Sequence, residues 1–154
     1  MKLSKKIKKS AIRTEMKASN KDEALKELVE LLCSAYNLKE KDTILEAIVK
    51  REEKQSTGVG MGLAVPHAKT PVVDQLYIAF GRSPDGIDFD SADGEKATLF
   101  FILVSPRDIS GPHIKALAKI SRMMKNEDIR KALVACTSEK EFTEIIKKAE
   151  GKHL

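Results

Sequence analysis

Apolar and polar positions form four patterns that favour β-strands. Residues 11–18 and 74–83 alternate at every second position, the period of a strand with one buried face. Residues 62–66 form a short apolar run ending at Pro66, which cannot donate a ladder hydrogen bond. Residues 97–105 are continuously apolar, as is typical of a central strand covered on both faces. The inward positions expected in the alternating segments are Ile12, Thr14, Met16, Leu76, Ile78 and Phe80.

Five further segments have the apolar spacing of amphipathic helices. They are residues 20–36, 41–53, 111–125, 126–136 and 138–150. Their start signals are Asn20 with Glu23, Asp42 or Thr43, Pro112, Asn126, and Ser138 with Glu141. The inward faces expected for the first two helices are Leu25, Leu28, Val29 and Leu32, then Ile44, Leu45, Ile48 and Val49.

The interleaving of strands and helices predicts the fold class. We expect an α/β (α+β) protein, with a single mixed sheet sandwiched between helices. The 154 residues show no repeat, low-complexity run or linker, so residues 1–154 are predicted to form one domain with a core over about 3–150. An Asp93-Gly94 pair marks a turn before the last strand.

Charge is concentrated at the start of the chain. The net charge is +5, and the five lysines within residues 1–10 account for all of it. A nucleic-acid-binding protein usually spreads a basic face over its fold with stacking aromatics, and aromatics are only 5% here, so we expect no nucleic-acid partner. The basic segment is expected to form a solvated helical turn with Leu3 and Ile7 facing inward.

Composition also narrows the class of protein. With 42% hydrophobic and 33% charged residues, and no apolar run of about 20 residues, the sequence favours a soluble protein with no membrane insertion. The first residues lack the apolar core of a secretory signal, so a cytoplasmic location is the expectation. Cys33 and Cys136 form no CxxC motif and are expected to be buried, reduced thiols.

The stretch STGVGMGLAVPHAK, residues 56–69, holds glycines at 58, 60 and 62. A dinucleotide fingerprint would need a glycine at Leu63, and a Walker loop would need one before Lys69, where Ala68 stands. Both nucleotide interpretations therefore fail. The glycines permit positive φ angles or close backbone approach, and they can expose backbone amides to an anion.

The three histidines are the main candidates for chemistry. His67 follows Pro66, where a strand end can hold a side chain rigidly, and His113 lies in the first turn of a predicted helix. The helix dipole there disfavours protonation, so His113 could act as a neutral hydrogen-bond donor. His153, near the C-terminus, is expected to be inert. Taken singly, each histidine is more often structural than catalytic.

Three kinds of site could use these histidines. A metal site would add Glu52 or Asp108 to the pair, but no HExxH, HxH or Cys/His cluster is present. A serine hydrolase is disfavoured because Ser56 is in no G-x-S-x-G elbow. A phosphohistidine site uses more of the features, because a neutral imidazole is a nucleophile and amides and cations stabilise the phosphoryl group. Arg51 offers such a cation, although a surface ion pair with a glutamate is an equal alternative.

The motif in residues 51–69, together with segments 87–106 and 113–124, resembles the fructose–mannitol type enzyme IIA (EIIA type-2) of the phosphoenolpyruvate-dependent sugar phosphotransferase system. This family includes the nitrogen-regulatory IIA proteins. The helical segment 20–32 fits as well, and the resemblance covers residues 3–150.

The resemblance implies a phosphotransferase that carries a phosphoryl group on His67. His113 would be the second active-site histidine, Arg51 the stabilising arginine, and Thr57 and Gly58 the loop beside the site. It implies an HPr-type phosphocarrier protein as the donor and an enzyme IIB as the acceptor, with no metal or other cofactor. The alternative is a regulatory protein whose phosphorylation state controls binding to partner proteins. Docking to a membrane permease complex and the sugar specificity are left open.

Overall fold

The computed structural model describes residues 1–153, with side chains described up to Gly151. The side chain of His153, which the sequence predicts to be inert, therefore lies outside the described residues. Within the described part of the chain, two long helices follow the first strand, five strands come next, and three helices follow the last strand.

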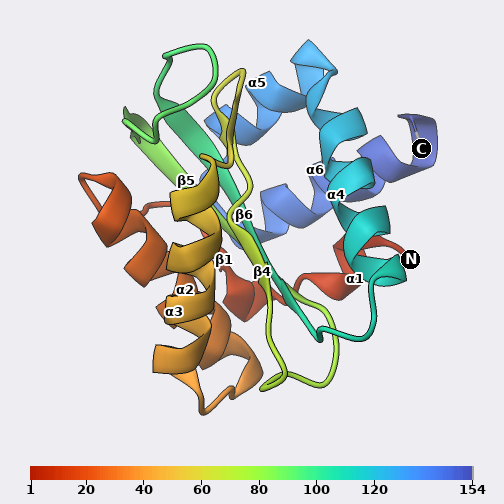
Figure 1. Cartoon of the computed structure of the whole chain (residues 1–154). Helices are drawn as coiled ribbons and strands as arrows, with labels where there is room; N and C mark the ends of the chain where they lie inside the picture. The colour runs from red at the N-terminus through yellow and green to blue at the C-terminus, as the bar shows by residue number, and fades with distance from the viewer. Residues whose placement is uncertain (154) are drawn as a thin grey trace.

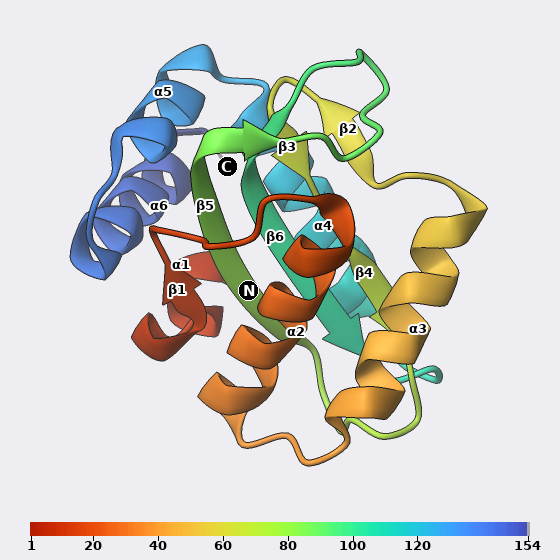
Figure 2. The same cartoon turned by 90° about the vertical axis from the view of Figure 1, so that its left-hand side faces the viewer.

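Two layers of helices enclose one mixed β-sheet, as predicted. Figure 1 shows the layers: α2 and α3 cover one face, and α4, α5 and α6 cover the other. In Figure 2 the sheet faces the viewer, with α2 in front of β5 and β6 and α4 behind them. The helices are α2 (Lys21–Tyr36), α3 (Lys41–Lys54), α4 (Gly111–Met124), α5 (Glu127–Ala135) and α6 (Glu139–His153).

In the described chain, the sheet is built around a central antiparallel pair of strands, β5 and β6. They are β1 (Ile12–Arg13), β2 (Gly58–Gly60), β3 (Leu63–Ala64), β4 (His67–Lys69), β5 (Tyr77–Ile87) and β6 (Ala97–Ser105). The order is β1-β5-β6-β3-β2, and β4 also pairs with β6, parallel to it, as does β3. The strands β3 and β4 thus follow the same edge of β6 one after the other, interrupted at Val65 and Pro66.

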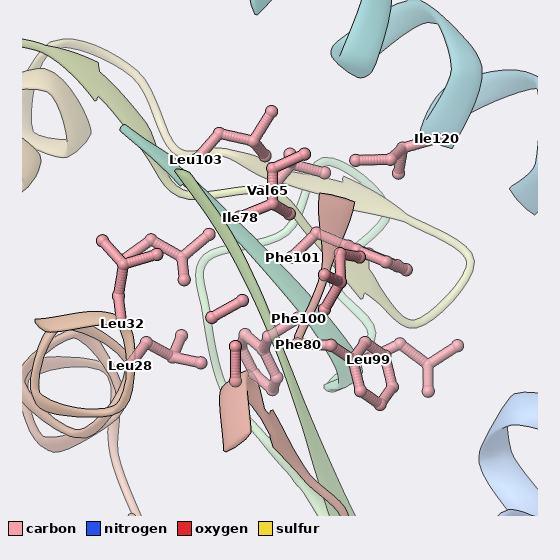
Figure 3. Close-up of a cluster of buried hydrophobic side chains, with 14 of the residues drawn as sticks. Leu28, Leu32, Val65, Ile78, Phe80, Leu99, Phe100, Phe101, Leu103 and Ile120 are labelled. Atoms are coloured by element: carbon pink, nitrogen blue, oxygen red, sulfur yellow. The ribbon is translucent and has the colours of Figure 1, made fainter. Parts of the chain in front are cut away.

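Burial on both faces explains why the sequence of β6 is continuously apolar. Figure 3 shows Leu28 and Leu32 of α2 on one side of the central strands and Ile120 of α4 on the other. The rings of Phe80 on β5 and Phe101 on β6 lie 5.0 Å apart. A strand with only one covered face would alternate apolar and polar residues instead of being apolar throughout.

The starts of α2, α4 and α5 follow local signals in the sequence, whereas α3 has Glu40 at its N-cap position, before the expected Asp42 or Thr43, with no side-chain cap. Asn20 caps α2, because its side chain accepts the backbone N–H of Glu23 at 2.9 Å. The Glu23 carboxylate in turn accepts the N–H of Ser19, one residue before the position expected for a capping box. Asn126 caps α5 in the same way, and Pro112 lies in the first turn of α4.

The short N-terminal helix α1 (Leu3–Lys6) forms the predicted turn. Leu3 and Ile7 are both buried, as expected. The carboxylate of Glu150 on α6 accepts the N–H groups of Leu3 and Ser4, at 2.7 and 3.1 Å. A 3₁₀ turn, η1 (Lys9–Ala11), connects α1 to β1. The first residues are therefore part of the packed domain.

Two local predictions are wrong. The strand expected over residues 11–18 ends at Arg13, because the chain bends at Thr14 and Glu15, where the Arg82 guanidinium donates to the Thr14 carbonyl. The Met16 N–H still donates to the Arg82 carbonyl of β5. Val49, expected to face inward, is exposed on α3, whereas Ile44 and Ile48 are buried. The predicted burial of Cys33 and Cys136 as free thiols is confirmed.

Candidate functional site

His67 begins β4, at the point where the chain leaves the bend at Pro66. Its backbone pairs with Leu103 of β6, and the Pro66 carbonyl accepts the N–H of Leu103, so both flanks of the histidine are fixed. The ring nitrogen Nδ1 lies 2.8 Å from the carbonyl oxygen of Val65. Because a carbonyl can only accept, Nδ1 must carry a proton. In the neutral imidazole, Nε2 then keeps a free lone pair, as a nucleophile requires.

His113 lies in the first turn of α4 and is almost fully buried, with 3% of its surface exposed. Its Nδ1 is 2.6 Å from the hydroxyl oxygen of Ser105, the last residue of β6. Within the described residues, that nitrogen is the one hydrogen-bond partner of the Ser105 side chain. A hydroxyl can donate or accept, and when this one donates to Nδ1 the proton of a neutral His113 lies on Nε2.

The pairing of β4 with β6 brings the two histidines together. Lys69 pairs with Ser105, so the end of β6 lies beside β4, and the chain then turns through residues 106–110 into α4. The rings of His67 and His113 lie edge to face, with centroids 5.4 Å apart. The two imidazoles thus meet although 46 residues separate them in the chain.

Both imidazoles are kept neutral. Burial is the main cause of the lowered pKa of His67, and the nearby Arg51 charge lowers it further, against the opposing effect of the Val65 carbonyl. Burial likewise lowers the pKa of His113, to about 4, with contributions from His67 and Lys69. At neutral pH the pair therefore offers one lone pair and one N–H, which is the combination needed to attack and hold an anionic group.

Arg51 lies in the last turn of α3, beside β4. Its guanidinium donates to the carbonyl of Gln55 at 2.8 Å, which orients the side chain at the helix end. Among the described residues, no carboxylate lies within 4.0 Å of Arg51. The surface ion pair considered as an alternative role therefore does not form there. Its charge is near enough to His67 to add to the lowering of that pKa, after the larger effect of burial.

Glu52 organises the loop that follows α3. Its carboxylate accepts the N–H of Thr57 at 2.7 Å and the Thr57 hydroxyl at 2.5 Å. Lys21 of α2 pairs with the same carboxylate at 3.1 Å. Glu52 is buried, with 6% of its surface exposed, so these contacts offset the cost of burying its charge. The loop over residues 55–58 is therefore tied to α2 and α3.

The glycine stretch does not expose all its amides. The N–H of Gly58 donates to the Ser56 hydroxyl at 3.0 Å, and that of Met61 donates to Asp93 at 3.0 Å. A Cβ at Gly58 would lie 2.5 Å from the Ser91 hydroxyl oxygen, so close packing explains this glycine. The Gly58 amide is therefore already used within the loop, whereas Thr57 lines a hollow together with His67.

Two hollows meet at His67 and Arg51. One, of about 520 Å³, is lined by cationic residues and both histidines. Its lining consists of Ala47, Lys50, Arg51, Lys54, His67, Ala68, Lys69, Arg107, His113 and Leu117. The other, of about 450 Å³, has Arg51 as its only cationic lining residue among those described and includes Val59 and Met61, which are 52% and 48% exposed. His67 therefore lies between a strongly basic hollow and a less charged one.

The residues suggested for a metal site do not converge. Among the described residues, no group of three or more His, Cys, Asp or Glu side chains has an arrangement that could hold a metal ion. Glu52 uses both oxygens on Thr57 and Lys21, and Asp108 is absent from the hollow that contains the histidines. The donor set favours an anionic group over a cation.

The sequence did not predict that Ser105 contacts His113 or that Glu52 holds the loop at Thr57. Ser105 reads as the end of an apolar strand, and only the register of β6 against β4 places its hydroxyl beside His113. Glu52 had been considered only as a possible metal ligand. The one signal in the sequence that Glu52 holds this loop is its position, next to Arg51 and five residues before Thr57.

Comparison with known proteins agrees with this geometry. The family model "Phosphoenolpyruvate-dependent sugar phosphotransferase system, EIIA 2" matches residues 5–149. The chain belongs to this family. It is 34% identical over 128 residues to a fructose-specific EIIA component of Haloferax volcanii, covering 83% of each.

Two other relatives differ in their architecture and in the role given by their names. A fructose-specific EIIABC component of Bacillus subtilis is 38% identical over 95% of this chain, which spans only 23% of that larger protein. The crystal structure of the nitrogen regulatory protein IIA-Ntr from Neisseria meningitidis superposes with a TM-score of 0.87. It has 30% sequence identity and covers 94% of this chain and 98% of that one. EIIA 2 proteins thus include both sugar-specific components and regulators.

None of the described helices of this EIIA 2 protein has the length and apolar character that crossing a membrane requires.

Proposed function

We propose that this EIIA 2 protein accepts a phosphoryl group on Nε2 of His67 and passes it to a second protein. The observation that carries the proposal is the hydrogen bond from Nδ1 to the Val65 carbonyl, which leaves the Nε2 lone pair free. The lone pair forms the new P–N bond while the bond from phosphorus to the donor nitrogen breaks. The donor nitrogen keeps that electron pair, and the Nδ1 proton stays on the Val65 hydrogen bond.

The neighbouring residues have supporting roles in this proposal. His113 donates from Nε2 to a phosphoryl oxygen, and Arg51 supplies positive charge as negative charge spreads over the transferring group. Thr57 and Gly58 shape the adjoining loop, which Glu52 holds in place. The transfer needs neither a metal ion nor another cofactor, because the phosphoryl group is carried covalently by the histidine.

The proposed donor is an HPr-type phosphocarrier protein, and the proposed acceptor is an enzyme IIB, with the exchange taking place in the cytoplasm. The Bacillus subtilis relative is named as an EIIABC component, in which an A unit belongs to the same protein as B and C units. The family and this architecture support an IIB acceptor that serves uptake of a fructose- or mannitol-type sugar.

A regulatory role is the second candidate. The specific observation in its favour is the extent of the match to the Neisseria meningitidis nitrogen regulatory protein, which covers 98% of that chain. In this role, the charge added at His67 changes association with regulatory target proteins. Donation from the phosphorylated protein to sugar-specific IIB proteins distinguishes the two roles, because only the transport role requires it.

Reconstitution tests the proposed chemistry. The protein is incubated with phosphoenolpyruvate, enzyme I and an HPr-type phosphocarrier, and acid-labile phosphate is measured on the chain. We expect stoichiometric labelling that His67→Ala abolishes, and full labelling of that variant would overturn the assignment. His113→Ala should keep part of the labelling but lose about tenfold or more in the transfer rate, as removal of a transition-state donor does.

A further inference from the structure

Five lysines near the start of the chain carry positive charge that the candidate site does not use. This lysine cluster consists of Lys2, Lys5, Lys6, Lys8 and Lys9. None of the five forms an ion pair among the described residues. Lys6 and Lys8 donate hydrogen bonds of 3.0 Å, but to neutral acceptors, the side-chain oxygen of Gln75 and the carbonyl of Ala35. The charge of Asp74 acts on Lys6 from beyond ion-pair distance. The cluster therefore keeps most of its charge uncompensated.

The backbone that carries the lysine cluster is packed against two helices. The Glu150 carboxylate of α6 accepts the N–H of Leu3 at 2.7 Å, and Lys119 of α4 donates to both Glu150 and the carbonyl of Met1. Figure 1 shows the start of the chain, in red, beside α4. Leu3 and Ile7 are buried in the core. The lysines therefore belong to a fixed surface of the domain and not to a free arm.

Burial of the apolar positions leaves the charged ones at the surface. Four of the five lysines are exposed, and Lys6 is half-buried. The second half of α6, which packs against α1 at Glu150, adds the exposed Lys147 and Lys148. Glu150 itself is buried and paired with Lys119 at 3.1 Å, so its charge does not oppose these lysines at the surface. The surface formed by α1 and the end of α6 is thus basic.

The chemistry of this surface fits an extended anionic layer better than a nucleic acid. Residues 1–10 contain no arginine, which is the residue that reads base edges through two parallel hydrogen bonds. The aromatic ring that the cluster contacts is Tyr36, which lies under Lys8 at 5.5 Å and beside the ring of Tyr77 at 4.9 Å. That ring is not free to stack on a base. Lipid headgroups need no such fixed geometry, because each lysine is attracted to the charged layer independently.

We propose that the lysine cluster binds the surface of a bilayer that contains anionic phospholipids. The contact is electrostatic and reversible, and each lysine close to such a surface strengthens binding about fivefold. None of the five lysines lines either hollow at His67, so lipid binding leaves both hollows accessible. The proposal does not rest on the proposed function, since the unphosphorylated chain already presents these charges.

Vesicle co-sedimentation tests the proposal. Binding of the natural chain and of Lys5→Gln/Lys9→Gln is measured on phosphatidylcholine vesicles with about 40% phosphatidylglycerol, at about 0.05 M salt. We expect the double variant to bind at least about tenfold more weakly, as the loss of two fivefold contributions implies. Binding of the natural chain should also fall about tenfold or more on pure phosphatidylcholine, and by a similar factor at about 0.5 M salt, where the charges are screened.

Two matched variants separate the position of the charge from its amount. Lys26→Gln/Lys125→Gln removes the same charge from exposed lysines on α2 and at the end of α4, and should bind within about threefold of the natural chain. Lys5→Arg/Lys9→Arg keeps the charge and should bind within about twofold. Equal thermal unfolding midpoints for all the variants show that each is folded.

The outcomes decide between an anionic bilayer and other partners. Equal binding to vesicles with and without phosphatidylglycerol would overturn the proposal, as would equal losses for Lys5→Gln/Lys9→Gln and Lys26→Gln/Lys125→Gln. Tighter binding to a duplex RNA of about 20 base pairs than to the anionic vesicles, weakened by Lys5→Gln/Lys9→Gln, would assign the surface to nucleic acid and reject the lipid. Phosphoryl labelling of His67 is measured separately, and its absence would reject the proposed function while leaving the vesicle results unchanged.

Discussion

The hydroxyl oxygen of Ser105 and Nδ1 of the buried His113 share a hydrogen bond of 2.6 Å. Ser105 ends β6 and His113 lies in the first turn of α4, and a short loop connects the two elements. In the proposed mechanism the hydroxyl donates to Nδ1, so that the neutral ring donates from Nε2. Ser105 would then set the role of His113 without touching the phosphoryl group itself.

Ser105→Ala should therefore change the tautomer of His113. We expect ¹⁵N NMR to show a mixture of Nδ1–H and Nε2–H forms in place of a single Nε2–H form, and transfer to slow by about tenfold, the equivalent of one lost hydrogen bond. The matched control is Ser83→Ala, at a buried serine on β5. An unchanged His113 spectrum in Ser105→Ala would show that the hydroxyl does not set the tautomer.

The lowered pKa of His113 predicts a loss of stability in acid. Its value is about 4 in the folded protein against about 6.5 in an unfolded chain, so the unfolded state binds the proton first as the pH falls. This contribution to stability is intact above the unfolded value and is lost between about pH 6.5 and pH 4. The full loss is about 3 kcal/mol, since one pKa unit corresponds to about 1.4 kcal/mol.

Urea unfolding at a series of pH values measures this effect. The free energy of unfolding of His113→Asn should fall less steeply over the same range, because the substituted side chain takes up no proton. Parallel slopes for the two proteins would show that His113 does not titrate in this way.

Glu52→Gln tests the buried carboxylate that holds the loop. Glutamine keeps the shape but removes the charge that pairs with Lys21 and one of the acceptors used by Thr57. We expect a loss of about 2–4 kcal/mol in the free energy of unfolding, typical of breaking a buried ion pair. Its neighbour Glu53 is exposed, so Glu53→Gln should change stability by less than about 0.5 kcal/mol. Equal unfolding midpoints for the two variants would contradict this role for Glu52.

Close packing predicts that Gly58 cannot be replaced by alanine without cost. The added Cβ would lie 2.5 Å from Oγ and 2.9 Å from Cα of Ser91, so the loop has to shift. Overpacking of this kind costs about 1–3 kcal/mol, measurable by thermal unfolding. At Gly111 a Cβ would meet no atom within 4 Å, so Gly111→Ala should not lower the midpoint. A Gly58→Ala variant as stable as Gly111→Ala would mean that the loop adapts freely.

The sequence predicted those parts of the fold that depend on local or periodic signals. The apolar run of β6 and the caps at Asn20 and Asn126 are confirmed, because each depends on neighbouring residues or on burial of both strand faces. The division of the strand beside β6 into two short strands, β3 and β4, was not predicted. Strands of two or three residues exist only through their pairing with β6. Periodicity alone placed Val49 inward, but the helix turns it to the surface.

The sequence predicted which residues form the candidate site but not how they work together. The resemblance singled out His67, His113 and Arg51, and the structure brings them together around one hollow. The protonation states could not be predicted, because they depend on one carbonyl two residues from His67 and one hydroxyl eight residues from His113. Such contacts follow from strand register and from the angle at which a loop enters a helix, and neither is encoded in a local pattern.

Site-resolved NMR of the phosphorylated protein tests the central claim most directly. The chain is labelled with ¹⁵N, phosphorylated by phosphoenolpyruvate, enzyme I and an HPr-type phosphocarrier, and examined for coupling between ³¹P and the imidazole nitrogens. The account predicts one phosphoryl group, coupled to Nε2 of His67, with Nδ1 of the same ring retaining its proton. Coupling to Nδ1 of His67, or a phosphoryl group on His113 or any other residue, would contradict it.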